Sequence, residues 1–258
     1  MSTGLPPLLT WPFVVALAAV LGSFLNVCIS RLPRGESVVS PPSHCPRCQA
    51  PIRYYDNLPL VSFMVLAGRC RACREPISWR YPLVEALAVA VGLLVLWRLG
   101  PTWEGLRAFL LGLALIAVAF TDLETFLIPD RITLPGIGAG LAFRLYPSAW
   151  DVIDGVLGGI VAGGIFFFIM WASPFVFGRE GMGFGDVKLA AMMGAFLGLS
   201  VVLVAIFLGV LAGGLTATAL LILGLRRVGE YLPFCTFLAL GGVLAALWGR
   251  PLLAWYLG

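Results

Sequence analysis

Eight long apolar runs constrain this chain more than any other feature of its sequence. A helix needs about 20 predominantly apolar residues to cross the hydrocarbon core of a bilayer. The runs fall at about 8–30, 82–98, 106–121, 132–147, 152–173, 187–205, 206–224 and 235–256. We therefore expect an all-α polytopic membrane protein with about eight transmembrane helices. The division of 187–224 is the least defined, because Gly213-Gly214 fits either a turn or a helix–helix contact. Seven spans are the alternative.

The composition excludes the other broad classes. Apolar residues make up 60% of the 258-residue chain and charged residues only 12%, about half the roughly 25% of a soluble domain. A soluble domain built from such a chain would have too little polar surface to face water, which excludes that class. Disorder is excluded because disordered chains are poor in apolar residues. We expect a first transmembrane span at 1–30, a loop domain at 31–81 and a transmembrane domain at 82–258.

The segment 31–81 stands apart by its positive charge. It holds eight arginines and three acidic residues, a net charge of +5, whereas the whole chain carries +4. Because basic loops stay in the cytosol, this loop is expected there and the N-terminus outside. A basic patch beside a membrane span favours anionic lipid headgroups over nucleic acid, so we expect a lipid bilayer and no nucleic acid as partner.

The same loop carries two C-x-x-C pairs. Cys45-Pro-Arg-Cys48 and Cys70-Arg-Ala-Cys73 are separated by 21 residues, a pattern typical of a zinc ribbon. Four thiolates would complete the tetrahedral shell of zinc and leave no position for a substrate, so the predicted site is structural. The alternative is two redox-active or unliganded thiol pairs. Cys28 and Cys235 have no partner pattern and are interpreted as packing residues.

Two acid-bearing stretches lie where apolar runs end or begin, at the edge expected to face the cytosol. Asp122 follows the third run, and Asp186 follows alternating glycines before the sixth. Two carboxyls brought together can share one proton, so that one activates water while the other protonates a leaving amine. That is aspartic-protease chemistry. The simpler interpretations are an interfacial charge or cap for Asp122 and a helix cap for Asp130. Lys188 pairs either with an acid or, as we expect, with a phospholipid.

The chain resembles the bacterial prepilin peptidases, also called type IV leader peptidases, from about residue 22 to 240. The motifs that carry the resemblance are Gly22-Ser-Phe-Leu-Asn-Val27 with Arg31-Leu-Pro33, both C-x-x-C pairs, Asp56-Asn-Leu-Pro59, Arg80-Tyr-Pro-Leu-Val-Glu85, Asp122 through Asp130, Gly181 through Leu189, Leu232-Pro-Phe234 and Phe237-Leu-Ala-Leu-Gly241. One departure is Cys235-Thr236, which stands where we expect Gly-Pro. We expect it to lie away from both aspartates.

The resemblance implies an inner-membrane aspartic protease of the G-x-G-D type, with Asp122 and Asp186 as the catalytic pair. It implies cleavage of prepilin or pseudopilin leaders at the cytosolic face, followed by S-adenosylmethionine-dependent methylation of the new N-terminal residue. The four-cysteine loop favours the two-activity form. The alternatives are a leader peptidase without methyl transfer, a transporter that uses acids at the membrane edge, and a non-catalytic zinc-ribbon scaffold. No residues for binding S-adenosylmethionine can be named from the sequence.

Overall fold

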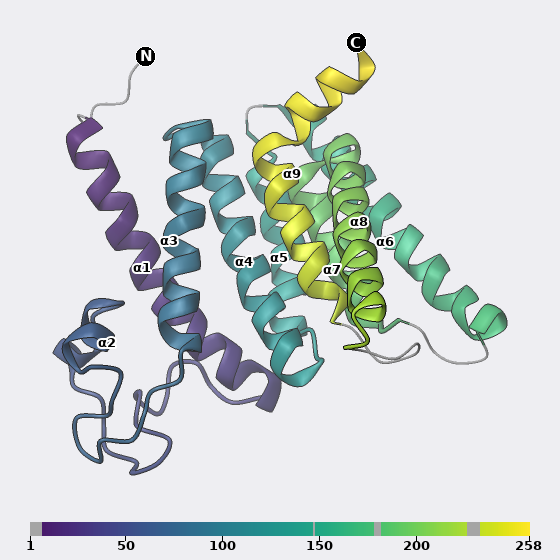
Figure 1. The fold of residues 1–258 in the computed structure, drawn as a ribbon. Coiled ribbons are helices and arrows are strands. Elements are labelled where there is room, and N and C mark those ends of the chain that lie inside the picture. The colour runs from purple at the N-terminus through teal and green to yellow at the C-terminus, as the bar shows by residue number, and fades with distance from the viewer. Residues whose placement is uncertain (1–6, 147, 178–181, 226–232) are drawn as a thin grey trace. The chain divides into compact units, whose positions relative to one another are not determined.

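The computed structural model describes residues 7–146, 148–177, 182–225 and 233–258 of a helical chain (Figure 1). It divides into two compact units, Met1–Pro101 and Thr102–Gly258. The first holds α1 (Pro7–Arg31), the short α2 (Val61–Val65) and α3 (Arg80–Leu99). The second holds α4 (Trp103–Thr125), α5 (Asp130–Phe143), α6 (Ala149–Phe177), α7 (Phe184–Leu197), α8 (Leu199–Ile222) and α9 (Phe234–Leu257). The predicted domain limits at residues 31 and 82 stay predictions.

The all-helical prediction is confirmed, but eight spans are not. A helix stands at each apolar run, yet only six in the described part of the chain are long and apolar enough to cross a membrane: α1, α3, α4, α6, α8 and α9. Helices α5 and α7 have 14 residues each, or about 21 Å at 1.5 Å per residue. That length is shorter than the roughly 30 Å hydrocarbon core.

In the first unit, α1 packs closely on α3. A Cβ atom at Gly22 would come within 2.9 Å of both the Ala88 Cβ and the Glu85 Cα, so only glycine allows this approach of the two helices. The Asn26 amide Nδ2 adds a hydrogen bond of 3.1 Å to the Tyr81 carbonyl. The loop between the two helices holds two short 3-10 turns, Leu32–Arg34 and Tyr54–Asn57, besides α2.

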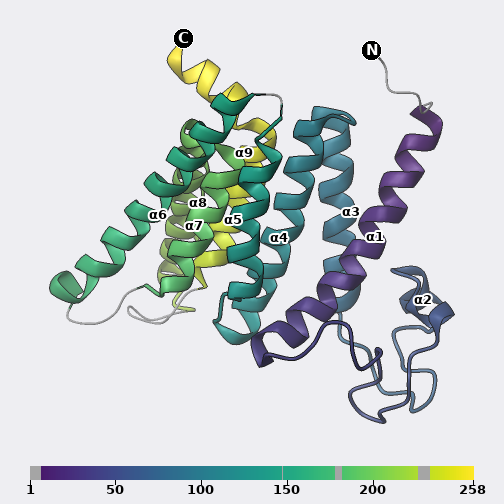
Figure 2. The same cartoon turned by 180° about the vertical axis from the view of Figure 1, so that it is seen from behind.

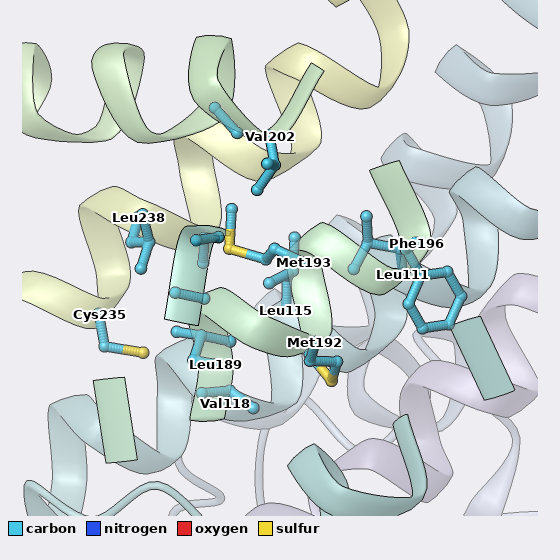
Figure 3. Packing of buried hydrophobic residues seen from close by; sticks show 14 of the residues in the cluster. Leu111, Leu115, Val118, Leu189, Met192, Met193, Phe196, Val202, Cys235 and Leu238 are labelled. Atoms are coloured by element: carbon cyan, nitrogen blue, oxygen red, sulfur yellow. The ribbon is translucent and has the colours of Figure 1, made fainter. Parts of the chain in front are cut away.

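The second unit is a bundle in which α6 packs on α7, α8 on α9, α5 on α7 and α4 on α9. Figure 2 shows these helices from behind. Its core is formed by side chains from α4, α6, α7, α8 and α9. Figure 3 shows part of it, with Leu115, Val118, Leu189, Met193, Val202 and Leu238 among the labelled residues. Helix α7 therefore lies inside the bundle, which explains why so short a helix is almost continuously apolar.

The long apolar run 187–224 breaks at Gly198. The expected boundary at 205/206 is wrong, because α8 runs unbroken from Leu199 to Ile222 and includes Gly213-Gly214. Gly198 has φ +82°, a left-handed value that favours glycine. Gly213 instead packs against the Phe237 ring at 3.5 Å, which is the helix-contact role that small residues have in membranes.

A buried arginine joins the helix ends at which α5 and α7 finish and α6 and α8 begin. The Arg144 guanidinium donates to the carbonyls of Asp151 at 2.6 Å and Phe196 at 3.0 Å, and it forms an ion pair with Asp154. Asp154 also accepts the backbone N–H of Leu199 at 3.0 Å. One charge network thus joins the ends of four helices, because a buried charge is stable only when it is paired and hydrogen-bonded.

Candidate functional site

Asp122 lies in the last turn of α4. Its side chain is 4% exposed, and Phe126 closes the helix with φ +53° and an N–H bond to the Asp122 carbonyl. The carboxylate atom Oδ2 is buried and has no hydrogen-bond partner among the described residues. A buried acceptor without a donor is costly by about 1–3 kcal/mol. Asp122 is therefore placed to accept a hydrogen bond from a molecule that enters the site.

Asp186 lies in the first turn of α7, and its side chain is 7% exposed. Its backbone N–H bonds the Gly183 carbonyl at 3.2 Å. The preceding Gly185 faces Ile128, because a Cβ atom there would lie 2.9 Å from the Ile128 Cβ. The glycine thus allows the connection that follows α4 to lie directly on the start of α7. Gly181, the first glycine of the motif, lies outside the described residues.

The structure brings the two predicted aspartates within electrostatic range of each other. The end of α4 and the starts of α7 and α9, which carry the site, lie at the same end of the second unit (Figures 1 and 2). Two helices, α5 and α6, lie between Asp122 and Asp186 in the sequence, but α4 and α7 meet in one core. The site consists of two buried carboxyls from different helices.

Cys235 corrects one expectation from the sequence. Its thiol, at the start of α9, interacts electrostatically with both Asp122 and Asp186, so it does not lie away from them. Figure 3 shows Cys235 in the same buried cluster as Leu189 and Val118, which are one turn from Asp186 and Asp122 respectively. Nothing in the sequence placed α9 at the site, because the contact depends on how distant helices pack.

Asp130 and Lys188 also differ from expectation. The cap position of α5 is Pro129, which makes no side-chain cap bond, and Asp130 is the first helical residue. The cap interpretation of Asp130 is therefore wrong. Asp130 forms an ion pair with Lys188 of α7, which is the acid pairing considered for Lys188 beside a lipid contact. This pair joins the starts of α5 and α7 two residues beyond Asp186.

The four cysteines form a second candidate site, in the loop of the first unit. Their sulfur atoms all lie within 4.8 Å of one another, and the Sγ atoms of Cys45 and Cys73 are 3.9 Å apart. A tetrahedral ion with Zn–S bonds of about 2.3 Å requires sulfur separations of about 3.8 Å. The donor set and its spacing therefore fit zinc.

The two C-x-x-C turns have the same backbone hydrogen bonds. The N–H of Cys45 bonds the Ala50 carbonyl at 2.9 Å, and that of Cys70 bonds the Glu75 carbonyl at 2.8 Å. Gln49 and Arg74, each four residues after the first cysteine of its pair, have φ values of 60° and 62°. The chain thus builds the same knuckle twice and turns the two pairs of thiols toward one point.

The thiols differ in acidity. Backbone N–H groups of Cys73 and Ala72 lower the pKa of Cys70 to about 7. At Cys73 the Glu75 N–H lowers the pKa, but desolvation and the other three thiols outweigh it and raise the pKa to about 12. Four thiolates this close together require a cation to balance their charge.

We expect the purified protein to contain one zinc ion per chain, measured by inductively coupled plasma mass spectrometry. Cys45→Ser and Cys70→Ser should each lower the zinc content at least about tenfold, because structural zinc needs all four ligands. Cys28→Ala is the matched control and should keep the ion, since Cys28 is buried in α1 and is not in the cluster. Zinc-free wild-type protein with disulfides within the two pairs would contradict the prediction.

Two regions of the chain match known protein families. Residues 16–99 match the bacterial peptidase A24 N-terminal domain, and residues 109–218 match the type IV leader peptidase family. A prepilin leader peptidase/N-methyltransferase of Aeromonas hydrophila is 37% identical over 97% of this chain and 95% of its own length. The protein of the same name in Pseudomonas aeruginosa is 34% identical over 94% of this chain and 92% of its own length. No solved structure matches. The two matched regions and relatives that align along nearly their whole length show that the chain belongs to the type IV leader peptidase family.

Proposed function

We propose that this protein cleaves the leader from prepilins or pseudopilins at the cytosolic membrane face and then N-methylates the new N-terminal residue. The observation that carries the proposal is the meeting of Asp122 and Asp186, both buried, at one end of the second unit. The names of the relatives support both activities, and the four-cysteine cluster supports the two-activity form over a leader peptidase without methyl transfer.

Cleavage needs one ionised and one protonated carboxyl. The ionised group accepts a proton from a water molecule, whose oxygen attacks the carbonyl carbon of the scissile peptide bond. The protonated group donates its proton to the leaving amine nitrogen, so the pair is ready for the next cycle in the reverse arrangement. The free Oδ2 atom of Asp122 is the acceptor that such a water needs. Burial keeps other water away and strengthens both electrostatic interactions.

The number of spans before Asp122 supports a cytosolic active site. If the basic loop 31–81 is cytosolic, α1 enters the cytosol, α3 leaves it and α4 returns to it. All three are long and apolar enough to span, so Asp122 at the end of α4 faces the cytosol and the N-terminus lies outside. We place the protein in the bacterial inner membrane, with α5 and α7 as short helices that complete a set of eight membrane-embedded helices.

The second activity requires a methyl donor, and the relatives' name favours S-adenosylmethionine, whose sulfonium carries a transferable methyl group. We propose a structural role for zinc, held by Cys45, Cys48, Cys70 and Cys73. Because the two units are separate in sequence and in their contacts, we assign cleavage to the second unit and methyl transfer to the first.

The test is transfer of a labelled methyl group by the purified protein. A prepilin, and a pilin whose leader has already been removed, are each incubated with S-adenosylmethionine labelled in its methyl group. We expect the wild-type protein to label both, and an Asp122→Asn variant to label only the pilin without a leader. No label on either pilin, while the wild-type protein still removes the leader, would favour the peptidase without methyl transfer.

A further inference from the structure

Two polar side chains of the first unit lie in the contact between α1 and α3, and neither belongs to the sites described above. Asn26 is 2% exposed and Glu85 is 7% exposed. Gly22 and Asn26 are one turn apart on α1, and Tyr81 and Glu85 are one turn apart on α3. The space that a Gly22 Cβ would need is taken by the Glu85 Cα, and the Asn26 amide bonds the Tyr81 carbonyl. The two polar side chains therefore face the same helix contact.

Both side chains carry oxygen atoms that accept hydrogen bonds, and no cationic side chain of the described residues is paired with them. The Oδ1 atom of Asn26 is buried and has no hydrogen-bond partner among the described residues. Glu85 accepts the Leu60 N–H at 2.7 Å, and within the described chain no lysine or arginine pairs with it. A buried carboxylate needs a positive partner, because its desolvation is costly.

The place of this cluster limits the ligand. Glu85 is the sixth residue of α3, about 7.5 Å along the helix from its start, and Leu60 lies between the two cysteine pairs. A ligand here must carry a cation with several N–H donors at the edge of the bilayer. The next step rests on the proposed function. The product of leader cleavage carries a primary ammonium group at the start of an apolar helix, and this group has the required chemistry.

We propose that Asn26 and Glu85 bind the free N-terminal ammonium of the processed pilin and that Glu85 accepts its proton before methylation. The carboxylate takes one proton from the ammonium and leaves a neutral amine. The amine lone pair then forms a bond to the methyl carbon of the sulfonium donor. The carbon–sulfur bond breaks with its electron pair on sulfur, giving a thioether and a methylated ammonium.

Binding is tested with a peptide that has the sequence of the mature pilin N-terminus, in its free-amine and N-acetylated forms. The full-length protein is reconstituted in lipid nanodiscs. The wild-type protein should bind the free amine about 10-fold or more tightly than the acetylated peptide, since hydrogen bonds to charged groups are stronger than those between neutral groups. Glu85→Gln should remove this preference, although its amide oxygen still accepts the Leu60 N–H.

Activity separates this role from a structural one. Glu85→Gln should slow methyl transfer about 10²-fold or more, within the range for loss of a general base, while leader release stays within about twofold of the wild type. Asn26→Ala should weaken methyl transfer in the same selective way. Glu36→Gln is the matched control, because Glu36 is an exposed acid of the same unit, and it should leave both activities unchanged.

Two results would overturn the inference while the proposed function stands. One is a Glu85→Gln protein that methylates at the wild-type rate. The other is an equal loss of cleavage and methylation together with a lower melting temperature, which would make Glu85 a structural residue that holds Leu60. A wild-type protein that removes the leader but never methylates the product would reject the methyltransferase half of the proposed function itself.

Discussion

Replacing Asp122 or Asp186 by Asn is expected to lower the rate of leader release by about 10²–10⁴-fold, the range found when a positioned acid or base is lost. Asn has nearly the shape of Asp but can neither accept the proton of water nor donate one to the leaving amine. Both positions are buried and close to each other, so either change removes half of the pair. The rate of leader release from a prepilin in detergent or nanodiscs, followed by intact mass, measures the effect.

Glu104→Gln provides a matched control on the same helix as Asp122. Glu104 lies in the first turn of α4 and forms an exposed ion pair with Arg250, which contributes about 0–1 kcal/mol at most. This variant should cleave at the wild-type rate. A folded Asp122→Asn or Asp186→Asn protein that retains more than a tenth of wild-type cleavage would exclude the carboxyl pair as the cleavage site.

Gly185→Ala should reduce cleavage about 10²-fold, although the added methyl group carries no charge. The new Cβ would lie 2.9 Å from the Ile128 Cβ and 3.1 Å from its Cδ1, closer than side-chain carbons approach. The start of α7 must then move away from the segment that follows α4, and Asp186 moves with it. Displacement of a catalytic group by about 1 Å can lower a rate by about 10²-fold. The comparison of kcat with KM for a prepilin shows whether positioning is lost.

Gly138→Ala distinguishes this effect from a general effect of replacing helical glycine. Gly138 is an exposed residue inside α5, and no atom lies within 4 Å of the position that its Cβ would take. The substitution should leave cleavage unchanged and stabilise the helix by roughly 0.5–1 kcal/mol. Equal activity of Gly185→Ala and Gly138→Ala would show that contact with Ile128 does not position Asp186.

The sequence predicts well those features that depend on local composition. The apolar runs locate the helices, and the two C-x-x-C pairs predict the cluster of four thiols that the structure forms. The count of spans predicts Asp122 and Asp186 at one membrane edge, and the two carboxyls lie within electrostatic range of each other. Their roles in catalysis stay predictions until variants are measured.

Features that depend on packing between distant residues were not predicted. The break at Gly198 lies in a run with uniform hydropathy, and only the backbone angle of that residue marks it. Arg144 falls within the apolar run 132–147, and nothing in the sequence indicates that its guanidinium is buried among carbonyls from other helices. Cys235 reads as a packing residue, and its place near the aspartates follows from the contact of α9 with α4.

The most direct test of the two-activity account is the intact mass of a prepilin after incubation with the purified wild-type protein, with and without S-adenosylmethionine. We predict loss of the leader in both reactions, and the addition of one methyl group to the shortened chain only when the methyl donor is present. An intact prepilin in both reactions, with a folded enzyme and a substrate that a relative cleaves, would contradict the account.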